Sequence, residues 1–260
     1  TYQVAPSIFS RLGADIQIIN NQPNGLNINE NAGSIHPEFL IKAVLSAKAD
    51  LGIAFDGDGD RLIMVDELGR LIDGDQILFL LLKSYLQQNI MSGGLVGTLM
   101  SNLALEEKCK EMNIPFIRAK VGDKYVAEAL REKKWIIGGE NSGHIVLLDK
   151  HSTGDGIISS LQLIAFLQSN QESLSQALSN FPMYPQKLIN ITSIGKFNAD
   201  GDEVKPLIEQ ANEMMEGKGR VLIRESGTQP LIRVMTEGPD VEKVIESAQF
   251  LVDSINQTSQ

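Results

Sequence analysis

Three aspartates at alternate positions, Asp56, Asp58 and Asp60, are the residues of this chain whose types and spacing best suit chemistry. A glycine separates each pair, so the backbone can curl and let the three carboxylates converge on one point. Carboxylates that close to one another repel strongly at low dielectric, unless a cation lies among them. Oxygen ligands of this kind suit a hard divalent ion. The pattern therefore predicts a magnesium site.

Two alternatives compete with this interpretation of the acidic loop. A solvated turn is one, since Asp and Gly are common in turns, but strict alternation directly after the apolar run at 51–55 disfavours it. A calcium EF-hand is the other, because the three aspartates fit its positions one, three and five and Glu67 fits position twelve. Position six of that loop needs glycine, and Arg61 stands there. The flanking segments are also strand-like, so an EF-hand is excluded.

A second polar loop, residues 138–144, again lies between two apolar runs. Glu140, Asn141, Ser142 and His144 offer a carboxylate, an amide, a hydroxyl and an imidazole within five positions. Donors and acceptors of these kinds suit the hydroxyl groups of a sugar. His144 could also act as a general acid or base near neutral pH. A hydrophilic hairpin without function is the alternative.

A third loop, residues 224–230, contains Ser226, Gly227 and Thr228 between Arg224 and Arg233. A glycine flanked by hydroxyl groups can present backbone N–H groups in a concave nest, and an arginine beside it adds a planar, charged fork. This combination predicts a phosphate-binding loop. The Ser-Gly-Thr triplet alone is also a common turn, so the framing arginines favour the phosphate site.

The elements that must position these loops follow an α/β pattern, in which helical periodicity alternates with short apolar runs. Asp73 or Asp75 is placed to cap the helix that starts at residue 76. Two prolines indicate a linker at 181–185. Residues 8–12 are expected to be the end of a helix, and the further expected helices are 37–48, 76–88, 103–112, 125–133, 156–167, 204–215 and 241–255. The expected strands are 16–19, 51–55, 62–65, 95–98, 116–120, 135–138, 145–148, 187–191, 220–224 and 231–235.

Composition narrows the classes of function. The chain has 260 residues and a formal net charge of −10, which argues against nucleic acid or an anionic membrane as the main partner. Cys109 is the only cysteine, so an intramolecular disulfide is excluded and a reducing cytoplasm is expected. The longest apolar run, 77–82, is too short to cross a bilayer, and no signal peptide is visible. The chain starts at Thr1 without a methionine, so we expect a fragment of a longer protein.

Ordered segments along nearly the whole chain resemble the α-D-phosphohexomutase superfamily and, within it, the bacterial phosphoglucosamine mutases. The resembling segments are 22–29, the aspartate loop with its preceding strand at 49–61, 96–102, 119–123, 140–144 and 231–235. Related phosphomannomutases carry a histidine where this chain has Asp123, which favours the glucosamine branch. Gln229 departs from the usual glutamate of the family, with little effect expected on a loop that binds through backbone and hydroxyl groups.

The resemblance implies mixed-sheet α/β domains followed by a smaller α+β domain. Residues 1–70 would be the latter part of a second domain with the metal loop, 71–180 a third domain with the sugar loop, and 181–260 a fourth domain with the phosphate loop. The catalytic phosphoserine of the family lies in the first domain, in a Ser-His-Asn-Pro-type loop, and no such tetrapeptide occurs in this chain. We therefore expect the chain to be inactive alone. A homodimer is implied only through the first domain.

The implied reaction interconverts glucosamine 6-phosphate and glucosamine 1-phosphate through a phosphoserine enzyme and a bisphosphate intermediate, supplying a cell-wall amino-sugar precursor. By resemblance, the three aspartates hold Mg²⁺ against the phosphoserine, and Arg61 adds positive charge beside it. Glu140 and Ser142 bind ring hydroxyls, and His144 carries a proton. The residues that grip the other phosphate are Arg224, Ser226, Gly227, Thr228 and Arg233. A phosphomannomutase or phosphoglucomutase, or a phosphosugar-binding module without catalysis, are the alternatives.

Overall fold

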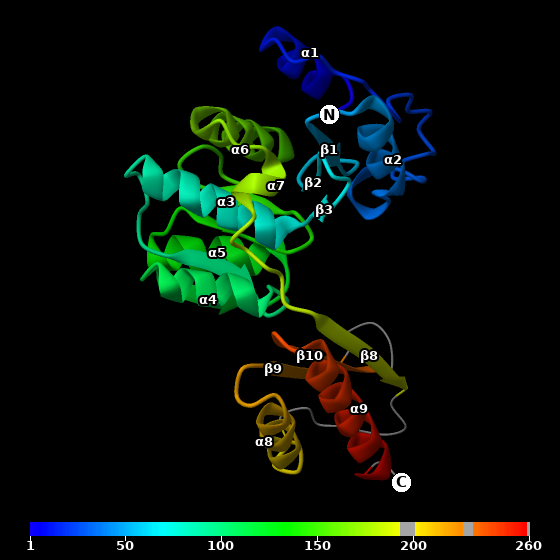
Figure 1. Cartoon of the computed structure of the whole chain (residues 1–260), viewed down its shortest axis with the longest axis vertical. Coiled ribbons are helices and arrows are strands. Elements are labelled where there is room, and N and C mark those ends of the chain that lie inside the picture. Colours follow the sequence, from blue (N-terminus) through cyan, green and yellow to red (C-terminus); the bar gives the residue numbers. More distant parts are fainter. Residues whose placement is uncertain (193–200, 226–230, 259–260) are drawn as a thin grey trace. The chain divides into compact units, whose positions relative to one another are not determined.

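A computed structural model describes residues 1–192, 201–225 and 231–258 of the chain (Figure 1). The chain forms two compact units. The first contains Thr1–Ser101 and Leu105–Pro182, and the second contains Asn102–Ala104 and Met183–Gln260. The predicted phosphate-loop residues Ser226, Gly227 and Thr228 lie outside the described residues.

The first unit begins with a small antiparallel sheet that carries the aspartate loop. Helix α1 (Val4–Arg11), the 3-10 helix η1 (Gly33–Ile35) and helix α2 (Glu38–Ala47) precede three strands, β1 (Leu51–Phe55), β2 (Leu62–Asp66) and β3 (Leu71–Ile72), in the order β1-β2-β3. The β1–β2 register pairs Leu51 with Asp66 and Phe55 with Leu62. The hairpin that joins β1 to β2 is therefore the segment with the three aspartates.

The predicted strand at residues 16–19 is wrong, because the structure has irregular backbone there. Ile18 and Ile19 are exposed, at 45% and 37% of their surface. Strand propensity depends strongly on packing against neighbouring strands, and no strand in the described ranges pairs with this segment. The apolar residues of this segment are therefore not sufficient to predict a strand.

The rest of the first unit is built around a four-stranded sheet with the order β5-β4-β6-β7. Strands β4, β5 and β6 are parallel, and β7 returns antiparallel to β6. In Figure 1, α3 and α6 lie on one side of this sheet and α4 and α5 on the other. The elements are α3 (Gly74–Gln87), β4 (Leu95–Thr98), α4 (Leu103–Glu111), β5 (Phe116–Ala119), α5 (Asp123–Lys133), β6 (Ile137–Gly139), β7 (Ile145–Leu147), α6 (Gly156–Asn170) and α7 (Leu174–Ala177).

Capping aspartates fix where two of these helices begin. Asp73 accepts hydrogen bonds from the backbone N–H groups of Asp75 and Gln76, and the Gln76 side chain returns the bond as a capping box. Asp155 accepts from the backbone N–H of Ile158 at 2.9 Å and starts α6. Of the two predicted caps for α3, Asp73 is the correct one. Each helix therefore starts at a defined residue, α3 directly after β3 and α6 after the segment that follows β7.

The core of the first unit lies between the parallel sheet and its helices. One cluster of buried side chains, from β4, β5, α5 and β7, comprises Val96, Ala119, Val126, Leu130 and Val146. Helix α3 is buried along most of its length, including Ile77, Leu80, Leu81 and Tyr85. A helix that is apolar on nearly all sides is expected at the centre of a unit, and α3 indeed contacts both α6 and β6.

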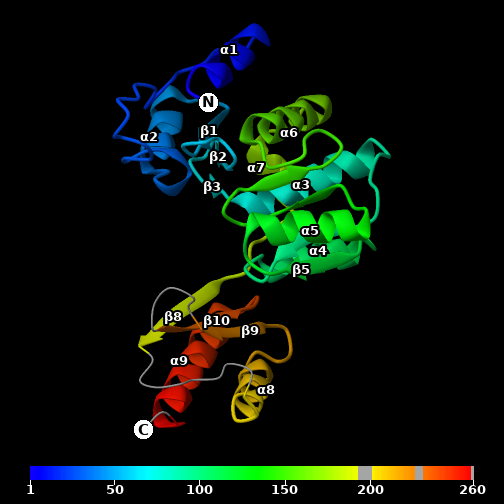
Figure 2. The ribbon, with the colours of Figure 1, turned by 180° about the vertical axis from the view of Figure 1, so that it is seen from behind.

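The second unit is a three-stranded antiparallel sheet with two helices. Its elements are β8 (Gln186–Thr192), α8 (Lys205–Met214), β9 (Arg220–Glu225), β10 (Leu231–Glu237) and α9 (Val241–Thr258). The strand order is β8-β10-β9, and α9 contacts β8, β10 and α8 (Figure 2). Its core comprises Ile191, Val204, Ala211, Ile223, Ile232, Val234, Leu251 and Ile255. None of the helices in the described ranges combines the length and apolar character that a membrane span requires.

Candidate active site

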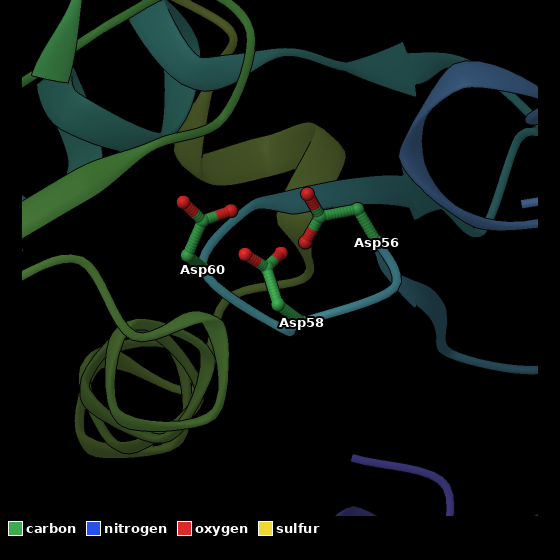
Figure 3. A group of neighbouring side chains, drawn as sticks. All are labelled: Asp56, Asp58 and Asp60. Carbon is green, nitrogen blue, oxygen red and sulfur yellow. The ribbon is translucent and has the colours of Figure 1, made fainter. Parts of the chain in front are cut away.

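The aspartate loop joins the partly buried end of β1 to the buried strand β2 and gathers its three carboxylates. Ligand oxygens of Asp56, Asp58 and Asp60 all lie within 4.8 Å of one another. Figure 3 shows the three carboxylates on the inner side of the curved loop, pointing into a common space. Asp58 is exposed, and the other two are partly buried. The convergence predicted from the alternating aspartates is confirmed for these side chains.

The negative charge of Asp56 is disfavoured by its surroundings in this group of aspartates. The pKa of Asp56 is raised above its ordinary value, mainly by burial and further by the carboxylates of Asp60 and Asp58, against the lowering effect of the Arg61 backbone N–H. That N–H donates to Oδ1 of Asp56 at 3.1 Å. The guanidinium Nε of Arg61 lies 3.8 Å from Asp56 Oδ2 and 4.0 Å from Asp60 Oδ1, too far for hydrogen bonds. The structure therefore holds three acidic groups together with one arginine to offset them.

The donor set fits a divalent metal ion. Two oxygens on opposite sides of a magnesium ion lie about 4.2 Å apart, so a small rotation of the side chains would bring all three carboxylates to one ion. Burial is the main cause of the raised pKa of Asp56, and a cation there would offset both that burial and the smaller repulsion from Asp60 and Asp58. The three aspartates form a group that could hold a metal ion.

The predicted sugar loop is the tight turn between β6 and β7. Gly143 N donates to Glu140 O at 3.0 Å, and Glu140 N donates to His144 O at 3.0 Å, which closes the turn. Glu140 is 8% exposed, whereas Ser142 at the tip is exposed. Oε1 of Glu140 accepts a hydrogen bond from the backbone N–H of Gly122 at 2.8 Å, ahead of α5. The Glu140 carboxylate is therefore held in a fixed position by a second loop.

The two loops of the first unit lie against each other. His144 forms a β-bridge with Arg61, and Leu62 N donates to Gly143 O at 2.9 Å. On the other flank, Gly156 N donates to Gly59 O at 2.9 Å. The side chain of His144 adds a contact of 3.0 Å between its Nδ1 and Oδ2 of Asp60. The structure thus brings Asp60, Arg61 and His144 together from segments far apart in sequence.

Arg224 and Arg233 lie in the second unit, opposite each other on β9 and β10. The pKa of Arg224 is lowered, first by burial and then by the positive charge of Arg233. Nε of Arg233 is buried without a hydrogen-bond partner among the described residues. Two adjacent arginines, one of them with an unused hydrogen-bond donor, are suited to binding an anion.

Sequence reasoning missed the glycines that let the loops meet. A Cβ at Gly74 would lie 2.0 Å from the carbonyl oxygen of Glu140, and one at Gly154 would lie 2.5 Å from Cε1 of His144. Gly122, with φ of 126°, supplies the N–H that holds Glu140. Gly74 and Gly154 each precede an aspartate at a helix start, and that repeated Gly-Asp pair was the available signal.

Three family models together match nearly the whole chain. They describe phosphoglucomutase/phosphomannomutase domains: the alpha/beta/alpha domain II over residues 1–69, the alpha/beta/alpha domain III over 73–184 and the C-terminal domain over 185–254. The chain belongs to the phosphoglucomutase/phosphomannomutase family. The resemblance to phosphohexomutases and the expected α/β fold class are therefore confirmed.

Curated relatives in this family are similar over almost all of the chain. The phosphoglucosamine mutase of Histophilus somni is 48% identical over 256 residues, covering 98% of this chain and 58% of the relative. That of Pseudomonas fluorescens is 49% identical over 258 residues, covering 99% and 58%. The chain thus spans less than two thirds of the length of the curated relatives that it matches.

Solved structures of family members share the fold. An N-acetylphosphoglucosamine mutase of Aspergillus fumigatus, in complex with GlcNAc-6P and magnesium, matches with a TM-score of 0.76 and 20% identity, over 98% of this chain and 59% of that one. A phosphoglucomutase/phosphomannomutase family protein of Burkholderia thailandensis matches with a TM-score of 0.78 and 20% identity, over 98% and 57%. At these identities the likeness shows the fold alone.

Proposed function

We propose that the chain is part of a phosphoglucosamine mutase, an enzyme that interconverts glucosamine 6-phosphate and glucosamine 1-phosphate. Identity of 48% to curated phosphoglucosamine mutases over 98% of the chain supports this substrate. The observation that carries the proposal is the contact between the aspartate loop and the Glu140–His144 turn. That contact joins the proposed metal-binding loop to the turn that carries Glu140, and it supports a single site formed by both.

Magnesium is the proposed ion, held by Asp56, Asp58 and Asp60. Its expected contribution is to stabilise negative charge on a transferring phosphoryl group. Arg61 extends positive charge beside the same group, since its guanidinium lies near two of the three carboxylates. Oxygen-only ligands and the short loop favour magnesium over softer metals.

Sugar and phosphate recognition are proposed for two further groups of residues. Glu140, fixed by Gly122, and Ser142, exposed at the tip of the turn, are proposed to bind ring hydroxyls. Arg61 and His144 are the two residues that the sequence assigns to catalysis. The contact with Asp60 occupies Nδ1 of His144. The residues proposed to bind the other phosphate are Arg224, Ser226, Gly227, Thr228 and Arg233.

The phosphoserine of the reaction is proposed to come from a region that the chain does not contain. No Ser-His-Asn-Pro-type tetrapeptide occurs in the 260 residues. We therefore expect the chain to bind phosphosugar without turnover. Division of the chain near residues 70 and 180 is part of the proposal and is supported by the limits of the three family models. We further propose that the enzyme is cytoplasmic and that a homodimer forms through residues outside this chain.

Calorimetry on the 260-residue chain tests the proposal. We expect glucosamine 1-phosphate with Mg²⁺ to bind more tightly than glucose 1-phosphate or mannose 1-phosphate. Asp58→Ala should abolish the magnesium dependence, and Glu140→Ala should weaken all three sugars. Equal binding of all three sugar phosphates would favour the broader phosphoglucomutase or phosphomannomutase assignment. Failure of every sugar phosphate to bind would contradict the proposal.

A further inference from the structure

His144 connects the sugar loop to the aspartate loop through its side chain. Its Nδ1 lies 3.0 Å from Oδ2 of Asp60. The whole residue is buried, with 3% of its surface exposed. An ionised carboxylate can only accept hydrogen bonds, so Nδ1 must be the donor. The two residues are 84 positions apart, so the contact is made by the tertiary fold and not by a local turn.

We propose that His144 is a positioning residue that orients Asp60 for metal binding. The inference rests on the proposed function to the extent that the three aspartates hold a divalent cation. Carboxylates that bind metals are themselves oriented by hydrogen bonds from surrounding groups. His144 occupies Oδ2 of Asp60, which leaves Oδ1 on the side of the loop shared with Arg61. Asp56 is anchored in the same way, through Oδ1, by the backbone N–H of Arg61.

The imidazole has little freedom to leave this position. A Cβ built on Gly154 would lie 2.5 Å from Cε1 and 2.7 Å from Nε2 of His144, so the backbone of Gly154 closes one edge of the ring. The backbone of His144 is bridged to Arg61, the residue between the last aspartate and β2. Main chain and side chain are thus fixed relative to the loop that they support. A donor held in this way orients its acceptor without loss of side-chain freedom on metal binding.

The same contact separates the roles of the two ring nitrogens. A proton carrier needs one ring nitrogen within hydrogen-bond reach of a substrate oxygen. Nδ1 of His144 is used by Asp60, so a proton carried by this ring would move through Nε2. Orientation of Asp60 is the role that Nδ1 supports, and it is compatible with proton transfer at Nε2.

Binding of Mn²⁺ to the 260-residue chain, followed by electron paramagnetic resonance, tests the inference without any assay of turnover. His144→Ala removes the donor. His144→Asn places an amide N–H where Nδ1 was, whereas His144→Gln places it one bond farther away, near Nε2. Asp58→Ala reports on the metal site itself. Thermal melting of each metal-free variant shows which proteins are folded.

We expect His144→Ala and His144→Gln to weaken Mn²⁺ binding by about 10- to 100-fold, as is common for residues that orient a metal ligand. His144→Asn should stay within about threefold of the original chain, because its amide N–H takes the place of the Nδ1 donor. Equal Mn²⁺ affinity for the original chain and His144→Ala, with binding lost in Asp58→Ala, would overturn the inference and leave the metal site standing. Loss of binding in a folded His144→Asn would also overturn it. Absence of Mn²⁺ binding by the original chain would overturn both this inference and the proposed metal site.

Discussion

Arg224 lies directly opposite Arg233 where β9 pairs with β10. Like charges at directly opposed positions destabilise a pair of strands. Burial, and then the charge of Arg233, lowers the pKa of Arg224, and Nε of Arg233 has no hydrogen-bond partner among the described residues. A pair that costs stability and leaves hydrogen-bonding capacity unused is better explained by anion binding than by a structural role.

Replacement of one member of this pair should separate binding from stability. Arg233→Gln should weaken binding of glucosamine 1-phosphate by at least about tenfold, since a hydrogen bond to a charged group is worth about 1.5–3 kcal/mol. The melting temperature should stay the same or rise, because the repulsion with Arg224 is relieved. Lys218→Gln removes the same charge from an exposed ion pair with Glu216 and serves as the control. A fall in melting temperature without a change in affinity would contradict the anion site.

Neutralising an aspartate should stabilise the metal-free chain. The pKa of Asp56 is raised, so its charged form is disfavoured by the fold at neutral pH. Asp56→Asn keeps the acceptor for the Arg61 N–H and removes that charge. We expect the melting temperature without metal to rise by about 1–3 °C, after allowance for solvent screening of this partly exposed group. The stabilisation that Mg²⁺ gives to the original chain should disappear in the variant.

The sign of this effect also sets its pH dependence. Because the pKa of Asp56 in the fold lies above its value in the unfolded chain, the folded state takes up a proton first as the pH falls. The advantage of Asp56→Asn should therefore shrink as the pH falls through the raised pKa. Thermal melting between pH 7 and pH 4 measures this, and a constant difference across that range would contradict it.

A substitution at Gly74 tests whether the start of α3 positions the sugar loop. A Cβ at this position would lie 2.0 Å from the carbonyl oxygen of Glu140 and 2.8 Å from the N of Gly143, both of them backbone atoms. Gly74→Ala must therefore displace the turn that carries Glu140. We expect weaker binding of glucosamine 1-phosphate together with a lower melting temperature. Full retention of affinity in the variant would show that the position of Glu140 does not matter for binding.

Glu67 should give the chain an acid-sensitive contact. Although burial acts to raise its pKa, the hydroxyl groups of Ser173 and Ser175 donate to its carboxylate and lower the pKa below the ordinary value. The stability that Glu67 contributes is therefore present above about pH 4.5 and is lost as the pH falls through the lowered pKa. Urea unfolding from pH 6 to pH 3 should show a steeper loss for the original chain than for Glu67→Gln. Parallel curves would contradict the contact.

Cys109 should be unreactive in the folded chain. Burial, with a smaller effect from Glu106, raises the pKa of its thiol to about 12. The thiolate is the reactive form, so almost none is present at neutral pH. A thiol reagent should modify the native chain far more slowly than the chain in denaturant. Fast modification of the native chain would contradict the buried position.

The aspartate loop was predictable because its chemistry is local. Three carboxylates within five residues can meet through their own backbone, and the flanking apolar runs became β1 and β2. The capping of α3 by Asp73 is equally local, since the donors lie two and three residues away. Patterns confined to one hairpin or one helix end are therefore sufficient for prediction.

The contacts between the loops could not be predicted from the sequence. His144 and Asp60 are 84 positions apart, and Gly122 and Glu140 are 18 positions apart. No periodicity in the sequence indicates that these residues meet, because their contact depends on how the sheets and helices pack. The failed strand at 16–19 has the same origin, since a strand needs a neighbour that its own sequence does not specify.

Anomalous diffraction from a crystal of the chain soaked in Mn²⁺ tests the metal site most directly. The account predicts one strong manganese peak within roughly 2.0–2.3 Å of oxygens from Asp56, Asp58 and Asp60, with His144 still hydrogen-bonded to Asp60. A crystal in which the three side chains stay apart, and manganese lies elsewhere or nowhere, would contradict it.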